Sequence, residues 1–165
     1  MDPKNSSSRS GAADLAAVDE IVARLHELPG AMLPILHEIQ RCFGYIPHEA
    51  VARIAAGLNL SRAEVHGVVS FYHDFRTEPP GRHVIRVCRA ESCQAMGAAA
   101  LEEHVIRTIG ASFGQTSADG EFTLEPVYCF GNCACSPAIM IDDTLIGRAS
   151  AAAFDAALAS RRGQS

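Results

Sequence analysis

The sequence predicts an α+β protein, in which a small helical bundle is followed by an α/β domain. Through residues 14–75, apolar side chains recur every three or four positions, which is the spacing of amphipathic helices. Residues 76–82 contain two prolines and a glycine, which cannot continue a helix and therefore indicate a linker. Residues 83–162 then combine short apolar runs, turn residues and helical spacing, which indicate strands and helices. Residues 1–13 are polar, and we expect them to form a disordered tail.

Composition narrows the class of protein. The 165 residues are 48% hydrophobic and 20% charged, which is enough for one compact domain or two small ones. The net charge of −5 gives no basic surface for nucleic acid or an anionic membrane. No run approaches the roughly 18 apolar residues of a membrane span, and residues 1–11 lack the apolar core of a signal peptide. We therefore expect a cytoplasmic protein with reduced thiols and no membrane insertion.

Apolar stripes predict the first two helices. The first begins at Asp14, ends at Pro29-Gly30, and carries the stripe Leu15, Val18, Ile21, Val22, Leu25 and Leu28. The second tolerates Pro34 near its start, and Gly44 can supply the left-handed conformation that ends it. Its buried face is marked by Leu33, Leu36, Ile39 and Phe43. Cys42 lies within this stripe, so we interpret it as a small core residue and not as a ligand.

Two further helices complete the predicted bundle. The third closes near residues 57–59 and carries Val51, Ile54, Ala55 and Leu58. The fourth starts at a capping box formed by Ser61 and Glu64, with Leu60 and Val65 in the positions of a hydrophobic staple. Its buried side is predicted to comprise Val65, Val68, Val69 and Tyr72. Four short helices with brief connections make a small bundle.

Histidines are concentrated in the bundle but do not form a ligand pattern. Five of the seven fall there, namely His26, His37, His48, His66 and His73. They are spread over different helices without an i, i+4 pair, so we expect them to face solvent or a partner. The sequence also lacks the motifs of a nucleophilic serine, a zinc protease helix and a phosphate-binding loop. No catalytic residue is predicted, and substrate chemistry is expected to occur elsewhere.

The second region starts with a strand from His83 to Val87, which Cys88 terminates. Residues Gln94 to Ile109 have helical spacing, so Cys93 is expected just before a helix N-terminus. There the amide dipoles would stabilise a thiolate or an anionic metal cluster.

A hairpin turn at Asp119-Gly120 makes Glu121 to Tyr128 a strand that ends at Cys129. Gly131 lets the backbone approach a cluster closely and can present an amide to a sulfur. The remaining elements are a strand pair and a terminal helix that ends with two arginines: Ala138 to Asp142, Thr144 to Gly147, and a helix marked by Phe154, Leu158, Arg161 and Arg162. Both cysteine clusters thus follow strands, where α/β proteins usually place functional loops.

The spacing of the cysteines indicates the kind of site that they form. Cys88 and Cys93 form one short cluster, and Cys129, Cys133 and Cys135 form another. Four thiolates complete the coordination of a [2Fe–2S] centre, and this spacing favours such a cluster. Zinc sites usually have tighter Cys-x-x-Cys knuckles, whereas disulfides need an oxidising compartment and redox dithiols usually form one Cys-x-x-Cys. These alternatives stay open on spacing alone, as does the choice between Cys133 and Cys135.

The pattern Cys-x4-Cys, then Cys-x3-Cys continued by Ala-Cys-Ser-Pro-Ala-Ile-Met-Ile, resembles the thioredoxin-like [2Fe–2S] family that includes the E-type subunit of NADH:quinone oxidoreductase. The spacing of plant-type ferredoxins is different. The resemblance covers about residues 20–160 and includes the segments 30–40, 43–47, 64–72 and 120–129. Within the family, the two cysteine segments look most like the gamma subunit of soluble, molybdenum-containing, NAD-dependent formate dehydrogenases.

The resemblance implies a thioredoxin-like domain that holds one [2Fe–2S] cluster on Cys88, Cys93, Cys129 and Cys133. Cys135 is then a packed thiol or a hydrogen-bond donor near the cluster. The implied role is an electron-transfer subunit that has no substrate chemistry alone and uses the helical bundle for docking. Its expected partners are a flavin-containing, NAD-binding subunit with FMN and a molybdenum and iron–sulfur catalytic subunit with molybdenum cofactor. The implied reaction is formate oxidation to carbon dioxide with NAD reduction.

Other interpretations of the protein's function remain open. The same subunit type occurs in NADH:quinone oxidoreductase and NAD-linked hydrogenase. A zinc-stapled structural adaptor, or a thiol–disulfide oxidoreductase that uses Cys133 and Cys135, would belong to a different class of protein.

Overall fold

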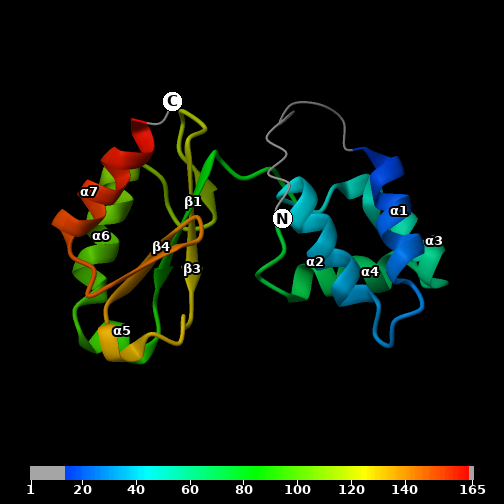
Figure 1. Cartoon of the computed structure of the whole chain (residues 1–165), viewed down its shortest axis with the longest axis horizontal. Coiled ribbons are helices and arrows are strands. Elements are labelled where there is room, and N and C mark those ends of the chain that lie inside the picture. Colours follow the sequence, from blue (N-terminus) through cyan, green and yellow to red (C-terminus); the bar gives the residue numbers. More distant parts are fainter. Residues whose placement is uncertain (1–13, 164–165) are drawn as a thin grey trace, which may run out of the picture. The chain divides into compact units, whose positions relative to one another are not determined.

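The computed structural model describes residues 14–163 and divides into two compact units, one ending at Pro79 and the other beginning at Pro80 (Figure 1). We call them the helical unit and the sheet unit. The predicted tail, residues 1–13, lies outside the described residues. None of the helices within residues 14–163 combines the length and apolarity that a membrane-spanning helix requires.

The helical unit contains four α-helices within its described residues: α1 (Leu15–Leu25), α2 (Met32–Phe43), α3 (His48–Leu58) and α4 (Arg62–Phe71). The helix ends follow local chemistry. The Asp14 carboxylate accepts the amides of Ala16 and Ala17 at the start of α1, and Gly44 ends α2 with a φ of 85°. The predicted capping box between Ser61 and Glu64 is present at the start of α4.

Apolar packing holds the helices together. The buried core consists of Val18, Ile21, Val22, Ala31, Ile35, Leu36, Ile39, Ile46, Ala50, Ile54, Ala55, Val65, Val69 and Phe75. An ion pair on the surface joins α1 to α2, because the Glu38 carboxylate accepts from Arg24 at 2.9 Å and from Arg41 at 2.8 Å. The five bundle histidines of the sequence analysis are all exposed.

Three side chains predicted to be buried in the bundle are exposed. Leu28 is 46% exposed and Tyr72 is 42% exposed, because α1 and α4 end before these residues are reached. Cys42 is exposed as well, so its interpretation as a core residue was wrong. It lies one turn after Glu38, on the polar flank of α2, whereas the apolar stripe centres on Ile39.

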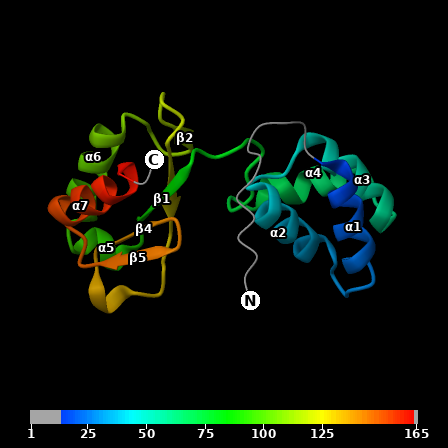
Figure 2. The same cartoon turned by 45° about the horizontal axis from the view of Figure 1, so that its top comes forward.

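The sheet unit is built on a mixed five-stranded sheet with the order β2-β3-β1-β4-β5. Its strands are β1 (His83–Cys88), β2 (Gln115–Thr116), β3 (Phe122–Val127), β4 (Ala138–Ile141) and β5 (Thr144–Gly147). Strands β1 and β3 are parallel, and the other neighbours are antiparallel. The register pairs Cys88 with Val127, so both central strands end at the same edge of the sheet. Figure 2 shows β5 beside β4 at the margin of the sheet.

Helices α6 (Ala98–Ile109) and α7 (Ala151–Arg162) lie on one face of the sheet (Figure 1). They bury a second apolar core made of Ile85, Val87, Leu101, Val105, Ile109, Ala111, Phe122, Leu124, Ile139, Ile141, Ala149, Phe154 and Leu158. The predicted fold class is therefore confirmed: helices α1 to α4 are followed by a thioredoxin-like α+β arrangement.

One predicted helix is divided in two. The sequence analysis placed Cys93 just before a helix that starts at Gln94, but Cys93 lies inside the short helix α5 (Glu91–Ala95). Gly97 then adopts a φ of 86° and separates α5 from α6. A left-handed residue cannot continue an α-helix, so the helical spacing after residue 94 misplaced the helix start. The predicted position of Cys93 just before a helix was therefore wrong, whereas its stabilisation by a helix N-terminus stays a prediction.

Candidate metal centre

The two cysteine clusters meet beyond the parallel strands β1 and β3. Cys88 is the last residue of β1, and Cys93 follows in α5. Both side chains are only 2% exposed. Cys129 comes two residues after the end of β3, and Cys133 opens a 3-10 helix, η1 (Cys133–Cys135). Cys129 and Cys133 are exposed, so one pair of thiols is buried and the other faces outward.

Each pair is in direct contact. The sulfurs of Cys129 and Cys133 lie 3.7 Å apart, and the Cys88 and Cys93 thiols hydrogen-bond to each other. Cys129 has a φ of 145°, an unusual backbone conformation for a residue with a side chain. Strained backbone of this kind is often found at ligand-binding sites.

Backbone amides point at the sulfurs of the site, and Cys133 uses its own amide. The Gly131 amide donates to Cys129 Sγ at 3.2 Å, as the sequence analysis anticipated. The amides of Ala90 and Phe130 donate to the sulfur of Cys88. The amide of Ala138 donates to the sulfur of Cys93. Amide donors stabilise negative charge on sulfur, which suits thiolates that bind a metal centre.

Hydroxyl groups join the two loops. Ser136 Oγ lies 3.5 Å from Cys93 Sγ and 2.8 Å from the carbonyl oxygen of Cys133. Ser92 Oγ lies 2.9 Å from Ser136 Oγ and 3.3 Å from the same Cys133 carbonyl. Residues from the first cluster are therefore hydrogen-bonded to residues from the second, although 40 or more positions separate them in the sequence.

Proximity of the thiols alters their acidity. Burial raises the pKa of Cys88, and the hydrogen bond that it donates to Cys93 raises that pKa further. Burial also raises the pKa of Cys93, but hydrogen bonds with Ser136, Cys88 and a backbone amide outweigh burial and lower it. The hydrogen bond with Cys129 raises the pKa of Cys133, and the charges of Cys129 and Cys93 add to this effect. Removing every proton is therefore costly unless a cation compensates the charge, and a metal centre supplies that compensation.

The candidate donor set consists of four thiols. Within residues 14–163, no three side chains of His, Cys, Asp or Glu gather closely enough to hold a single metal ion. Four of the six described cysteines form two contacting pairs, which are linked through Ser136. Four thiolates are the ligands that an all-cysteine [2Fe–2S] cluster uses.

Cys135 is held by its neighbours in the sheet. Its carbonyl oxygen accepts the Arg148 amide at 2.6 Å. A Cβ atom added at Gly147 on β5 would lie only 2.8 Å from Cys135 Cβ and 2.7 Å from Asn132 Nδ2. These close approaches fix the loop that carries Cys133 and are consistent with a packed thiol at position 135.

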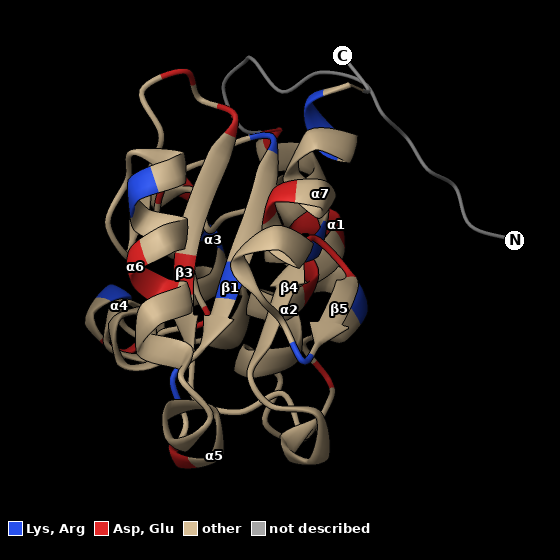
Figure 3. Cartoon of the chain, turned by 90° about the vertical axis from the view of Figure 1, so that its left-hand side faces the viewer, with Lys and Arg blue, Asp and Glu red and all other residues tan. Residues whose placement is uncertain are grey.

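The two segments that carry most of the site lack charged side chains, and the exposed Arg148 lies next to Cys135. Residues 93–101 and 126–141 contain no acidic or basic side chain. Figure 3 shows the acidic residue of α5, which is Glu91. Two large apolar side chains are exposed in these segments, Tyr128 at 69% and Met96 at 62%.

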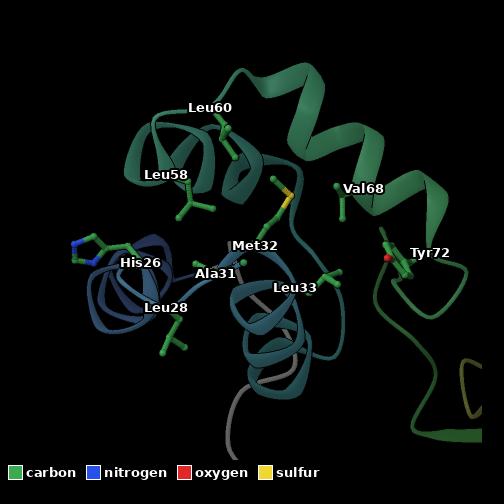
Figure 4. Close-up of a pocket in the computed structure, with 10 residues that line it drawn as sticks. His26, Leu28, Ala31, Met32, Leu33, Leu58, Leu60, Val68 and Tyr72 are labelled. Atoms are coloured by element: carbon green, nitrogen blue, oxygen red, sulfur yellow. The ribbon is translucent and has the colours of Figure 1, made fainter.

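A separate groove of about 410 Å³ lies in the helical unit. Figure 4 shows that it is lined mostly by apolar side chains, namely Leu28, Ala31, Met32, Leu33, Leu58, Leu60 and Val68, together with His26, Gly30 and Tyr72. This lining supplies neither a thiol nor a carboxylate, so the groove differs in chemistry from the cysteine site.

Sequence reasoning missed the hydrogen-bond donors of the site. Ser92 and Ser136 are ordinary polar residues in the sequence, and only the fold brings them together. Their positions directly beside Cys93 and close after Cys133 were the available signal. The amides that point at sulfur could not be located without the loop conformations.

Known proteins with similar sequences identify the family. The family model described as thioredoxin-like [2Fe–2S] ferredoxin matches residues 18–162. The E-type subunit of NADH-quinone oxidoreductase from Pseudomonas aeruginosa is 39% identical over 117 residues, covering 71% of this chain and 70% of that protein. An E-type subunit of the same enzyme from Rhizobium meliloti is 34% identical, covering 88% of this chain and 86% of that protein.

Hydrogenases provide further relatives. Subunit HndA of the NADP-reducing hydrogenase from Solidesulfovibrio fructosivorans is 32% identical, covering 78% of this chain and 77% of that protein. A crystal structure of an air-oxidised NAD+-reducing [NiFe]-hydrogenase matches with a TM-score of 0.70 and 28% identity over 86% of this chain. The match spans about a quarter of the hydrogenase chain, at 24% of its length.

These named relatives belong to NADH-quinone oxidoreductases and hydrogenases, and none of them is a formate dehydrogenase subunit. They favour the alternative parent complexes of the sequence analysis over the formate dehydrogenase gamma subunit. The cysteine pairs, the sheet topology and the family match over residues 18–162 lead to one conclusion: this chain belongs to the thioredoxin-like [2Fe–2S] ferredoxin family.

Proposed function

We propose that this chain is a one-electron carrier subunit of an NAD-linked oxidoreductase and holds one [2Fe–2S] cluster on Cys88, Cys93, Cys129 and Cys133. The observation that carries the proposal is the pairing of these thiols at the ends of two parallel strands, with backbone amides pointing at their sulfurs. When bound, such a cluster accepts and releases single electrons. With four thiolate ligands it leaves no open position for substrate, so the subunit has no substrate chemistry alone.

The parent complex that we favour is NADH:quinone oxidoreductase or an NAD-linked hydrogenase. Support comes from the names of the relatives, which are subunits of such enzymes. In either complex, the partner would be a flavin-containing subunit that carries FMN and binds NAD. The formate dehydrogenase assignment, with a molybdenum and iron–sulfur partner, rests only on the resemblance of residues 88–94 and 129–137 and is the second choice.

The cysteine site suggests where the flavin subunit docks. One thiol pair faces outward, and residues 93–101 and 126–141 contain no charged side chain and include the exposed side chains of Tyr128 and Met96. Aromatic residues and methionine are enriched in protein interfaces, where charged residues are depleted. We propose that this surface contacts the flavin subunit, because electron transfer requires the two centres to be close.

We also propose that the helical unit is a docking element. A stable interface normally buries about 1,000 Å² or more, which a small cluster domain does not readily supply alone. Phe71 is 74% exposed at the end of α4, and Leu28 and Tyr72 are exposed beside the apolar groove (Figure 4). We expect these apolar side chains to contact the same flavin subunit.

Metal and sulfide analysis tests the proposed cofactor. Protein purified without oxygen should contain about two irons and two acid-labile sulfides per chain, as a [2Fe–2S] cluster requires. Reduction with dithionite should produce an EPR signal from the reduced cluster. Zinc without sulfide would support the structural adaptor, and a reversible Cys133–Cys135 dithiol without iron would support the thiol–disulfide oxidoreductase.

Docking can be tested by placing a charge on the proposed docking surface. Tyr128→Glu and Met96→Glu should weaken co-purification with the flavin subunit and slow cluster reduction by NADH, while the iron content stays unchanged. Ala159→Glu provides a control, because it lies near the C-terminal end of α7, and Figure 1 shows that this end of the helix lies opposite α5 in the sheet unit. Unchanged co-purification of both surface variants would contradict the docking surface.

A further inference from the structure

Two buried or partly buried hydroxyls form a small network with Cys93 and Cys133. Ser136 is only 9% exposed, and its Oγ lies 3.5 Å from Cys93 Sγ, 2.9 Å from Ser92 Oγ and 2.8 Å from the Cys133 carbonyl oxygen. Ser92 Oγ also lies 3.3 Å from that carbonyl. Ser136 is therefore within hydrogen-bond reach of groups on both ligand loops.

The network has two hydroxyl protons and two possible arrangements. In the first, Ser92 donates to Ser136 Oγ, and Ser136 donates to the Cys133 carbonyl oxygen, which leaves Cys93 Sγ without a hydroxyl donor. In the second, Ser92 donates to the Cys133 carbonyl oxygen, and Ser136 donates to Cys93 Sγ. A free thiol at Cys93 is compatible with the first arrangement, because it can donate its own proton to Ser136.

A metal-bound Cys93 has no proton to donate, so its sulfur can only accept. The second arrangement then satisfies both the sulfur and the Cys133 carbonyl oxygen with the two available protons. Resting on the proposed function, we infer that Ser136 is a positioning residue whose hydroxyl donates to the sulfur of Cys93 and ties the two ligand loops together when the cluster is bound.

This hydrogen bond should raise the reduction potential of the cluster. Adding an electron increases the negative charge on the ligand sulfurs, so a donor stabilises the reduced form more than the oxidised form. Loss of the Ser136 hydroxyl should therefore shift the oxidised-to-reduced ratio at a fixed potential by about three- to tenfold. The upper limit corresponds to about 59 mV toward more negative potential for a one-electron couple.

The test compares Ser136→Ala, Ser136→Thr and Ser136→Val in the full-length protein, purified without oxygen and titrated by EPR. Threonine and valine have nearly the same shape and differ in the hydroxyl. We expect Ser136→Thr to keep a potential close to that of the parent protein, and Ser136→Ala and Ser136→Val to become more negative. Ser160→Ala, an exposed hydroxyl on α7, serves as the control and should change nothing.

Equal potentials in the threonine and valine variants would overturn the inference, because they would assign Ser136 a packing role alone. Where alanine or valine prevents cluster loading, iron retention decides instead: retention by threonine and loss by valine supports the hydroxyl, whereas equal retention or equal loss contradicts it. Failure of the proposed function is separately visible, because the parent protein itself would then lack iron and sulfide.

Discussion

The helical unit and the sheet unit differ in what they bury. In the described residues, the core of the helical unit is entirely apolar, and its ion pairs lie on the surface. The buried polar residues, Ser117, Thr123 and Ser136, all belong to the sheet unit, as do the buried thiols of Cys88 and Cys93. Burying polar groups is costly unless they are hydrogen-bonded, and here each finds partners. The helical unit therefore has a purely apolar interior, whereas the interior of the sheet unit also contains polar groups and the buried thiols of the cysteine site.

Removal of one ligand thiol should produce the largest difference between the units. Cys93→Ser should abolish nearly all iron and acid-labile sulfide binding, because a hydroxyl is a much poorer iron ligand than a thiolate. Cys42→Ser in the helical unit should change neither, since Cys42 is exposed outside the site. The measurement is iron and sulfide per protein molecule after anaerobic purification. Full cluster content in Cys93→Ser would contradict the assigned ligand set.

Truncating one buried side chain in each core should give the next largest effect, confined to the unit that carries the substitution. Phe154 and Ile54 are both fully buried, one in each core. Phe154→Ala should reduce the free energy of unfolding of the sheet unit by about 3–5 kcal/mol and accelerate cluster loss, and Ile54→Ala should cost the helical unit about 2–5 kcal/mol. Denaturant titrations followed by circular dichroism and by cluster absorbance would measure both. Equal cluster loss in the two variants would show that the units do not behave separately.

Glycine substitutions should change the free energy of unfolding by smaller amounts, with opposite signs in the two units. Gly147→Ala would place a Cβ 2.8 Å from Cys135 Cβ, so we expect a destabilisation of about 1–3 kcal/mol and a distorted ligand loop. Gly67 on α4 has open space around its added Cβ, so Gly67→Ala should stabilise the helical unit by about 0.5–1 kcal/mol. Thermal unfolding and the EPR line shape would record these changes. An unchanged line shape in Gly147→Ala would argue against tight coupling between β5 and the ligand loop.

The smallest expected effect is a pH-dependent one in the helical unit. Hydrogen bonds from Arg41 and Arg24 lower the pKa of Glu38 to about 2 from its ordinary value of 4.5. The stabilisation is therefore complete above about pH 4.5 and is lost as the pH falls toward 2. Because both arginines are exposed, Glu38→Gln should cost only about 0.5–1 kcal/mol at pH 7.

Asp19→Asn provides the matched control for Glu38→Gln, since Asp19 pairs with Arg53 at a more exposed position. Its effect should be close to zero. The test is to measure the free energies of unfolding of both variants and the parent protein between pH 7 and pH 2. A constant difference between Glu38→Gln and the parent protein over that range would exclude the carboxylate as its cause.

Most of the fold could be predicted because its signals are local. The stripe of α2, Gly44 at its end and the capping box of Ser61 and Glu64 each depend on residues within one or two turns. The strand boundaries around Cys88 and Cys129 were found for a similar reason, because turn residues and short apolar runs lie next to them. The break at Gly97 was missed, since helical spacing alone does not reveal a left-handed residue inside the pattern.

The candidate site could be predicted only in part. Spacing identified the cysteine clusters, and the family resemblance selected Cys133 over Cys135. The exposure of Cys42 depends on which side of α2 meets the other helices, and the role of Ser136 depends on a contact with Cys93 across 43 positions. Neither fact is encoded in a short segment, so both required the folded structure.

The central claim is that four sulfurs hold a pair of irons. Crystals of anaerobically purified protein, measured with X-rays above and below the iron absorption edge, test it most directly. We expect two iron peaks enclosed by the sulfurs of Cys88, Cys93, Cys129 and Cys133, with Cys135 and Cys42 outside bonding distance. A single metal peak, a zinc signal at this position, or iron bound by other residues would contradict it.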